Sequence, residues 1–209
     1  MNYLVTGTDT GVGKTFVTCG LVRFARAKGL DSVGMKPICT GNNDDVRQLL
    51  DACGCCEPEH LINPIWYRTP VAPYAASVIE DRLVDIGTIC KAFEKLATRH
   101  SIVLVEGAGG IAVPILADYD FRDLAKEIGL HVIVVAANCL GVLNHTRLTV
   151  EAIRSAGLKC SLIALNSVQC EPDISQATNM RFLKSLVDVP IAAVEHNQRE
   201  FGDLIALLW

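Results

Sequence analysis

The residues best able to do chemistry stand in a glycine-rich segment near the start of the chain, Gly7-Thr8-Asp9-Thr10-Gly11-Val12-Gly13-Lys14-Thr15. Its glycines allow the backbone to turn tightly and to point successive N–H groups at one spot, and the helix expected to follow adds its positive N-terminal dipole. Lys14 would neutralise outer phosphate oxygens, and the Thr15 hydroxyl would bind a magnesium ion. Thr8 stands where the plain motif has its first glycine, so the segment is a variant P-loop. The alternative is a glycine-rich turn without a ligand, but Gly-Lys-Thr between a strand and a helix is the context that phosphate binding requires.

Further reactive side chains follow two other apolar runs. Glu106 comes directly after the β-branched run 102–105, in the place of a Walker B acid, and residues 107–110 offer glycine backbone donors. Lys36 ends a second short run, and Thr40 behind it offers a hydroxyl to a polar substrate. A second lysine beside the phosphates suits a reaction that builds negative charge there. The alternatives are a turn-capping carboxylate for Glu106 and a solvated strand-end lysine for Lys36.

Two adjacent carboxylates, Asp44 and Asp45, stand at the start of an expected helix. Magnesium prefers oxygen ligands, so one of them could complete a metal site with Thr15 and Glu106. Acidic residues are also ordinary at helix N-termini, where they interact with the helix dipole. The residues alone leave both interpretations open.

Hydrophobic periodicity and turn residues predict the elements that must position these groups. Strands are expected at 2–5, 32–36, 102–105, 131–136, 160–166 and 190–194, and helices at 15–28, 42–54, 85–99, 121–128, 142–156, 175–187 and 199–208. This alternation predicts an α/β fold, a doubly wound and mainly parallel sheet with helices on both faces, with the ligand site at its carboxyl edge. We expect a single P-loop domain over residues 1–209. Four prolines make 58–73 an irregular connection, although its aromatic residues indicate an ordered covering segment.

Composition narrows the class of protein. The formal net charge is −4 and no basic run occurs, which argues against nucleic acid or a membrane surface as a partner. No apolar run reaches the roughly 18 residues of a membrane span, and no leader precedes the first strand, so we expect a cytoplasmic protein. Nine cysteines lie mostly in apolar runs, where a free thiol packs as a small hydrophobe. Cys53, Cys55, Cys56 and His60 could hold a soft metal, but zinc usually takes ligand pairs from two separate segments.

Together these motifs resemble the dethiobiotin synthetases, a family of ATP-dependent ligases with a P-loop fold. The resemblance runs from Tyr3 to about Asn166. It rests, in chain order, on the P-loop, on Lys36-Pro37 with Thr40-Gly41, on Glu106-Gly107-Ala108-Gly109-Gly110 with Pro114, and on Leu140-Gly141 with Asn144-His145. It implies that 7,8-diaminononanoate takes up CO2, supplied by bicarbonate, as a carbamate, that ATP phosphorylates this carbamate, and that the second amine closes the ureido ring of dethiobiotin, a late step of biotin biosynthesis.

Site roles carried over from the resemblance fall into four groups. It implies nucleotide contacts from Thr10, Gly11, Val12, Gly13, Lys14, Thr15, Phe16, Glu106, Gly107, Ala108, Gly109 and Asn166. It implies substrate contacts from Thr40, Gly109, Gly110, Leu140, Gly141 and Asn144, with the segment 139–144 reaching across the interface of a homodimer with shared sites. The implied magnesium ligands are Thr15, Asp45 and Glu106, with Asp45 preferred to Asp44. Lys14 and Lys36 are the implied catalytic cations beside the carbamate and the γ-phosphate.

Two segments depart from the family pattern. Ser167 follows Asn166 where an aspartate is common, and Glu195-His196-Asn197 replaces Pro-Trp-Leu after the last strand. Both belong to the family's adenine site, so we expect weaker discrimination among nucleoside triphosphates. Two rival functions remain on fold analogy, a partitioning-type switch ATPase and another ATP-dependent ligase of the same superfamily. The switch usually carries a signature lysine early in the loop, where this chain has Thr10.

Overall fold

One six-stranded sheet forms the centre of the computed structural model, which describes residues 1–168 and 174–208. Its strands lie in the order β10-β9-β8-β1-β5-β2, and all neighbours are parallel. The chain therefore winds outward from β1 to one edge, returns through β5, and continues to the other edge. The strands are β1 (Tyr3–Gly7), β2 (Ser32–Met35), β5 (Ile102–Gly110), β8 (His131–Ala137), β9 (Cys160–Asn166) and β10 (Ile191–Val194).

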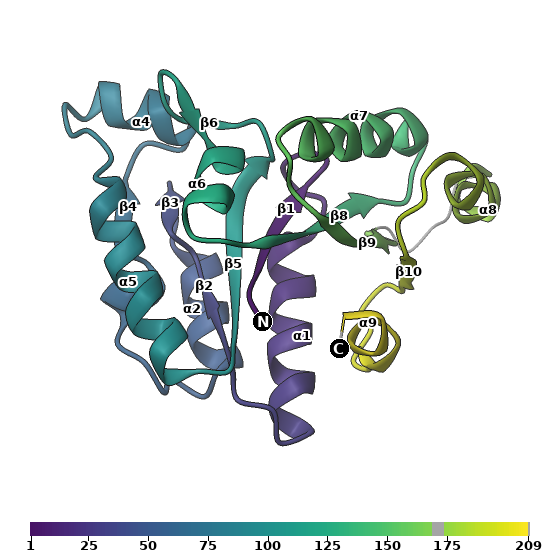
Figure 1. The fold of residues 1–209 in the computed structure, drawn as a ribbon, viewed down its shortest axis with the longest axis horizontal. Coiled ribbons are helices and arrows are strands. Elements are labelled where there is room, and N and C mark those ends of the chain that lie inside the picture. Colours follow the sequence, from purple (N-terminus) through teal and green to yellow (C-terminus); the bar gives the residue numbers. More distant parts are fainter. Residues whose placement is uncertain (169–173, 209) are drawn as a thin grey trace.

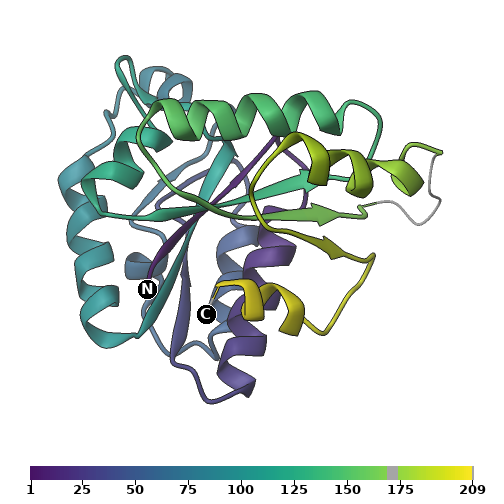
Figure 2. The same ribbon diagram turned by 45° about the vertical axis from the view of Figure 1, so that its right-hand side comes forward.

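Helices cover both faces of this sheet (Figure 1). They are α1 (Lys14–Ala27), α2 (Asp44–Ala52), α5 (Ile86–Arg99), α6 (Phe121–Glu127), α7 (Val142–Ser155), α8 (Gln176–Leu186) and α9 (Gly202–Leu208). α1 packs against α2 and α9 on one face, and α7 packs against α8 on the other. The turned view in Figure 2 shows the green α7 above the sheet, with the purple α1 and the yellow α9 below it. The predicted doubly wound α/β fold is confirmed.

The strands form where they do because β-branched and aliphatic residues are buried from both sides. β1 and the residues Ile102 to Glu106 of β5 are buried throughout. Parallel register then sets what meets at the carboxyl edge: Met35 pairs with Val105, and Gly7 pairs with Gly110. Lys36 and Glu106 each come one residue after the paired Met35 and Val105. The sheet thus brings them together with the loop that leaves β1.

Two short ladders beyond the main sheet differ from the sequence-based prediction. Residues 58–73 are not wholly irregular, because they contain the short helix α3 (Glu59–Ile62) and the strand β4 (Ile65–Tyr67). β4 pairs in parallel with β3 (Ile38–Thr40), and the helix α4 (Pro73–Ile79) follows. The predicted covering role holds, since Tyr67 is fully buried. β5 also extends five residues beyond the predicted 102–105, as far as Gly110. A small hairpin of β6 (Pro114–Leu116) and β7 (Tyr119–Asp120) comes after it.

The two ends of the described chain lie near one another in both views (Figures 1 and 2). The Tyr3 hydroxyl donates a hydrogen bond of 3.0 Å to the backbone oxygen of Leu208, which ties α9 to β1. No helix in the described residues is long and apolar enough to cross a membrane.

Candidate active site

The P-loop is shaped by two glycines in the left-handed region, Gly11 at φ 75° and Gly13 at φ 91°. Residues with a Cβ rarely adopt this conformation, so the loop depends on them. Gly13 precedes α1, whose N-terminus carries no side-chain cap and no acidic residue in its first turn. The free N–H groups and the helix dipole at this end therefore favour an anion such as a phosphate.

Asn166, at the end of β9, braces the loop from behind. Its side-chain amide donates a hydrogen bond of 2.9 Å to the backbone oxygen of Val12, and Asn166 is only 3% exposed. A Cβ at Gly13 would lie 2.1 Å from the Asn166 Nδ2 atom. The close approach between β9 and the loop thus requires a glycine at this position.

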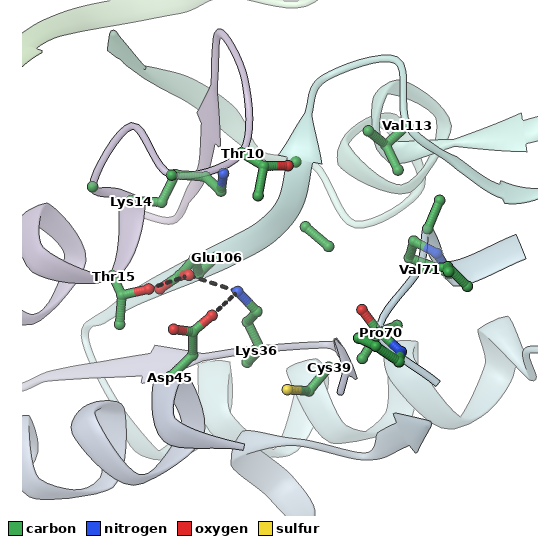
Figure 3. A pocket seen from close by; sticks show the side chains of 17 residues that line it. Thr10, Lys14, Thr15, Lys36, Cys39, Asp45, Pro70, Val71, Glu106 and Val113 are labelled. Atoms are coloured by element: carbon green, nitrogen blue, oxygen red, sulfur yellow. Dashed lines mark hydrogen bonds and ion pairs between the residues drawn. The ribbon is translucent and has the colours of Figure 1, made fainter. Parts of the chain in front are cut away.

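Four side chains, from α1, α2, β5 and the residue that follows β2, meet at the carboxyl edge of the sheet (Figure 3). The Lys36 ammonium lies 2.6 Å from Glu106 Oε1 and 2.7 Å from Asp45 Oδ2. The Thr15 hydroxyl donates to the same Glu106 oxygen at 2.8 Å. Asp45 rather than Asp44 therefore faces the loop, while Asp44 pairs with the exposed Arg47.

The two lysines have different electrostatic surroundings. Burial acts to lower the pKa of Lys36, but the Glu106 and Asp45 carboxylates raise it above its ordinary value, so the ammonium stays charged. Lys14 donates instead to the backbone oxygen of Asp9 at 3.0 Å. Burial, followed by the charge of Lys36, lowers the pKa of Lys14 to about 8. Burial also acts to raise the pKa of Asp45, yet Lys36 draws it below its ordinary value. An anion between the lysines would stabilise the charge on Lys14.

A cavity of about 600 Å³ opens beside these groups. Among the predicted site residues, it is lined by Thr10, Gly11, Gly13, Lys14, Thr15, Lys36, Thr40, Asp45, Glu106, Ala108 and Gly109. The lining also includes residues that were not expected, namely Cys39, Pro70, Val71, Ala72, Pro73 and Val113. Of these, the Pro-x-x-Pro spacing was a usable signal, because proline at the first position of a helix marks the start of α4 beside the site.

Other predicted site residues lie outside the lining of this cavity. Val12 and Asn166 contact each other behind the loop, as described above, and Gly107 packs near the ring of Phe121. The ring of Phe16 makes an edge contact with the ring of Phe201, with 5.8 Å between the two ring centroids. Gly110 lies against the backbone of Gly7, where a Cβ would come within 3.4 Å of the Gly7 oxygen.

The segment around the start of α7 also lies outside the cavity lining. Leu140, Gly141 and Asn144 are all exposed, and Leu140 is 83% exposed. The described chain thus presents these three predicted substrate residues on its surface. Their role stays a prediction, one that needs a second copy of the chain.

The side-chain oxygen atoms of Thr15, Asp45 and Glu106 fit a magnesium ion. Glu106 Oε2 is buried and has no hydrogen-bond partner among the described residues, although Oε1 of the same carboxylate has two. Only one oxygen of Asp45 contacts Lys36, and the Thr15 hydroxyl lies beside both carboxylates. Two carboxylates and a hydroxyl form the hard oxygen donor set that magnesium prefers. In the described residues no group of three or more His, Cys, Asp or Glu side chains could hold a metal, the cluster at Cys53 included.

Comparison with known proteins identifies the relatives of this chain. A family model described as an AAA domain matches residues 1–199. The chain is 49% identical over 173 residues to the ATP-dependent dethiobiotin synthetase BioD of Anaeromyxobacter sp. (strain Fw109-5), covering 81% of this chain and 77% of that one. It is 37% identical to the enzyme of the same name from Akkermansia muciniphila, over 99% of this chain and 97% of that one. The corresponding enzyme of Thermodesulfovibrio yellowstonii is 41% identical over 96% and 92% of the two chains.

Solved structures resemble this chain in fold alone. The MinC:MinD cell division protein complex of Aquifex aeolicus gives a TM-score of 0.57 at 13% identity, covering 97% of this chain and 84% of that one. The signal recognition particle receptor FtsY of Elizabethkingia anophelis, in complex with GDP, gives 0.57 at 14% identity, covering 91% and 55%. These neighbours confirm the P-loop NTPase type of fold.

Proposed function

Because this chain belongs to the ATP-dependent dethiobiotin synthetase family, we propose that it closes the ureido ring of dethiobiotin from 7,8-diaminononanoate, CO2 and ATP. One amine of the diamine adds to CO2 and loses a proton to give a carbamate. A carbamate oxygen attacks the γ-phosphorus of ATP, which forms a carbamic-phosphoric anhydride and releases ADP. The second amine then attacks the carbamate carbon and displaces phosphate.

The observation that carries this proposal is the buried ion pair between Lys36 and Glu106 beside the P-loop cavity. A nucleotide switch needs the loop and one carboxylate, but it has no evident need for a second buried cation there. Lys14 would bind the outer phosphates with the loop N–H groups. Lys36, 4% exposed and held in its charged form, would stabilise the negative charge that builds on the carbamate and the transferring phosphoryl group.

We assign Thr15, Asp45 and Glu106 as the residues that hold magnesium. When bound, the ion supplies positive charge to the phosphate oxygens of ATP. The three side chains orient the nucleotide relative to Lys36. The Asp45–Lys36 contact of 2.7 Å then couples the metal site to the catalytic lysine.

We assign the acceptor site to Thr40, Gly109 and Gly110 of one subunit, with Leu140, Gly141 and Asn144 supplied by a second copy. The exposure of the α7 start in this chain supports a homodimer with shared sites. We further propose that residues 1–209 act as one catalytic domain, because all its main strands join one sheet. The cytoplasm is the proposed location, since ATP and the diamine are small cytoplasmic metabolites.

The test is a mass-spectrometric assay of purified protein with 7,8-diaminononanoate, bicarbonate, magnesium and ATP. Ring-closed product with stoichiometric phosphate release is expected. Phosphate release without product would instead favour another ligase or a switch ATPase.

Subunit mixing tests the shared site separately. Lys36→Met and Asn144→Ala proteins should each be nearly inactive, and mixing them should restore part of the activity, because one site of each mixed dimer contains both native residues. Mixing without any recovery would contradict the shared site but leave the reaction intact.

A further inference from the structure

The backbone of Lys36 lies at the edge of the main sheet. β2 is the last strand in the sheet order, so within the described part of the chain no further strand of the main sheet pairs with its outer side. The segment between α3 and β4 takes that place. The Lys36 N–H donates a hydrogen bond of 2.7 Å to the Ile62 oxygen, and the Asn63 side-chain amide donates one of 2.7 Å to the Lys36 oxygen.

The Asn63 side chain is held in place by a second hydrogen bond. Its Nδ2 atom also donates to the backbone oxygen of Ile65 at 2.9 Å, so both amide hydrogens have carbonyl acceptors. Because each partner is an acceptor only, the amide group has a single chemically sensible orientation. Asn63 therefore ties the strand end at Lys36 to the start of β4.

The hydrogen bond from Asn63 holds the backbone of Lys36, the residue whose ammonium the reaction needs. The Lys36 ammonium must contact Glu106 and Asp45 at the same time, at 2.6 and 2.7 Å. Its side chain is long and flexible, and its reach is set by where the backbone begins. Pro37 follows and has no N–H to pair, so the backbone at this point is held through the N–H and the oxygen of Lys36.

We propose that Asn63 is a positioning residue for the reaction, acting through Lys36. The inference rests on the proposed function, in which Lys36 stabilises developing charge. Loss of the Asn63 amide leaves the Lys36 carbonyl without its donor and lets the strand end shift. A displacement of about 1 Å at a catalytic group lowers a rate by roughly 100-fold, so a partial shift predicts a fall of about 10- to 100-fold.

The experiment compares Asn63→Ala with His60→Ala, whose side chain is exposed on the neighbouring α3. Each variant is assayed for dethiobiotin at saturating diamine, bicarbonate and ATP, below its own unfolding temperature. We expect kcat of Asn63→Ala to fall about 10- to 100-fold while KM for ATP changes less than about threefold. The His60→Ala protein should match the parent in both constants.

A spectroscopic readout separates positioning from a purely structural role. In protein labelled with 15N at lysine Nζ, the Lys36 signal is identified by its loss in Lys36→Met. This signal should shift in Asn63→Ala and stay in place in His60→Ala. If Asn63→Ala fails to fold, Asn63→Asp replaces it, because the aspartate keeps the shape and lacks both amide hydrogens.

The outcomes distinguish the two levels of the proposal. A parent protein that forms no dethiobiotin overturns the proposed function, and the Lys36 signal still decides whether Asn63 positions that lysine. A folded Asn63 variant with parental kcat and an unmoved Lys36 signal overturns the positioning role. A lower melting temperature with unchanged kcat does so as well.

Discussion

Replacing Lys36 by methionine is the sharpest perturbation of this site, because methionine keeps most of the apolar stem and removes the charge. Within the described residues, the Lys36 ammonium is the one cation that pairs with Glu106, whose side chain is fully buried. It also pairs with Asp45, whose side chain is 41% exposed. Two carboxylates are then left facing each other beside Thr15. Both the stability of the apoprotein and the chemical step should suffer.

The size of each effect follows from burial. Removing one partner of a buried ion pair costs about 3–5 kcal/mol, and solvent screening at Asp45 places the expected cost near the lower end, about 3 kcal/mol. For a chain of this length, about 2–4 °C is lost per kcal/mol, so the melting temperature should fall by roughly 6–12 °C. Loss of one group that stabilises transition-state charge lowers kcat by about 100- to 1,000-fold.

Calorimetric titration with a non-hydrolysable ATP analogue and magnesium separates the two lysines. Lys36→Met should bind the nucleotide within about threefold of the parent, since no charge on the P-loop itself is removed. Lys14→Met should lose both nucleotide affinity and turnover. An equal loss of nucleotide affinity in both variants would refute the separate role of Lys36.

Three further predictions concern the loop, the base and the acceptor. Gly13→Ala should weaken nucleotide binding more than about tenfold by titration, because a left-handed backbone and the Asn166 amide both oppose a Cβ there, and parental affinity would contradict this. Turnover with GTP or CTP should lie within about tenfold of that with ATP, a margin of about 1.4 kcal/mol, whereas turnover with ATP alone would show a complete adenine site. Trp66→Phe removes the 2.8 Å hydrogen bond from the indole N–H to the Gly41 oxygen, next to Thr40. The KM for the diamine should rise roughly 2- to 12-fold, the equivalent of one hydrogen bond. An unchanged KM would show that this hydrogen bond does not position Thr40.

Short sequence patterns predicted the parts of the site whose conformation depends on neighbouring residues in the chain. The β-branched run before Glu106 indicates a buried parallel strand, and the structure has this strand, although it continues through the glycines to Gly110. Lys36 was likewise predicted at a strand end, because it precedes a proline at the end of a short apolar run. Once the sheet is parallel, the register alone brings these two side chains together.

The parts that were missed depend on contacts between distant segments. β3 and β4 are only three residues each and pair across more than twenty residues of intervening chain, so neither has a periodicity of its own. The prolines around them are typical of loops, which favoured the wrong interpretation as irregular chain. Asn63 gave no signal in the sequence, since its importance lies in the acceptors that folding places around it.

The displaced glycine of the P-loop has a physical reason that the sequence motif alone does not reveal. Gly7 is the last residue of β1, and a Cβ there would lie 2.7 Å from the Asp9 oxygen and 3.2 Å from the Lys14 ammonium. Thr8, in contrast, sits where its N–H donates to the Val135 oxygen of β8 at 3.0 Å. A Cβ is therefore excluded one residue earlier than in the plain motif, beside the Asp9 oxygen that accepts the hydrogen bond from Lys14. A glycine is needed at 7 because the Asp9 backbone lies so close, and a side chain is tolerated at 8.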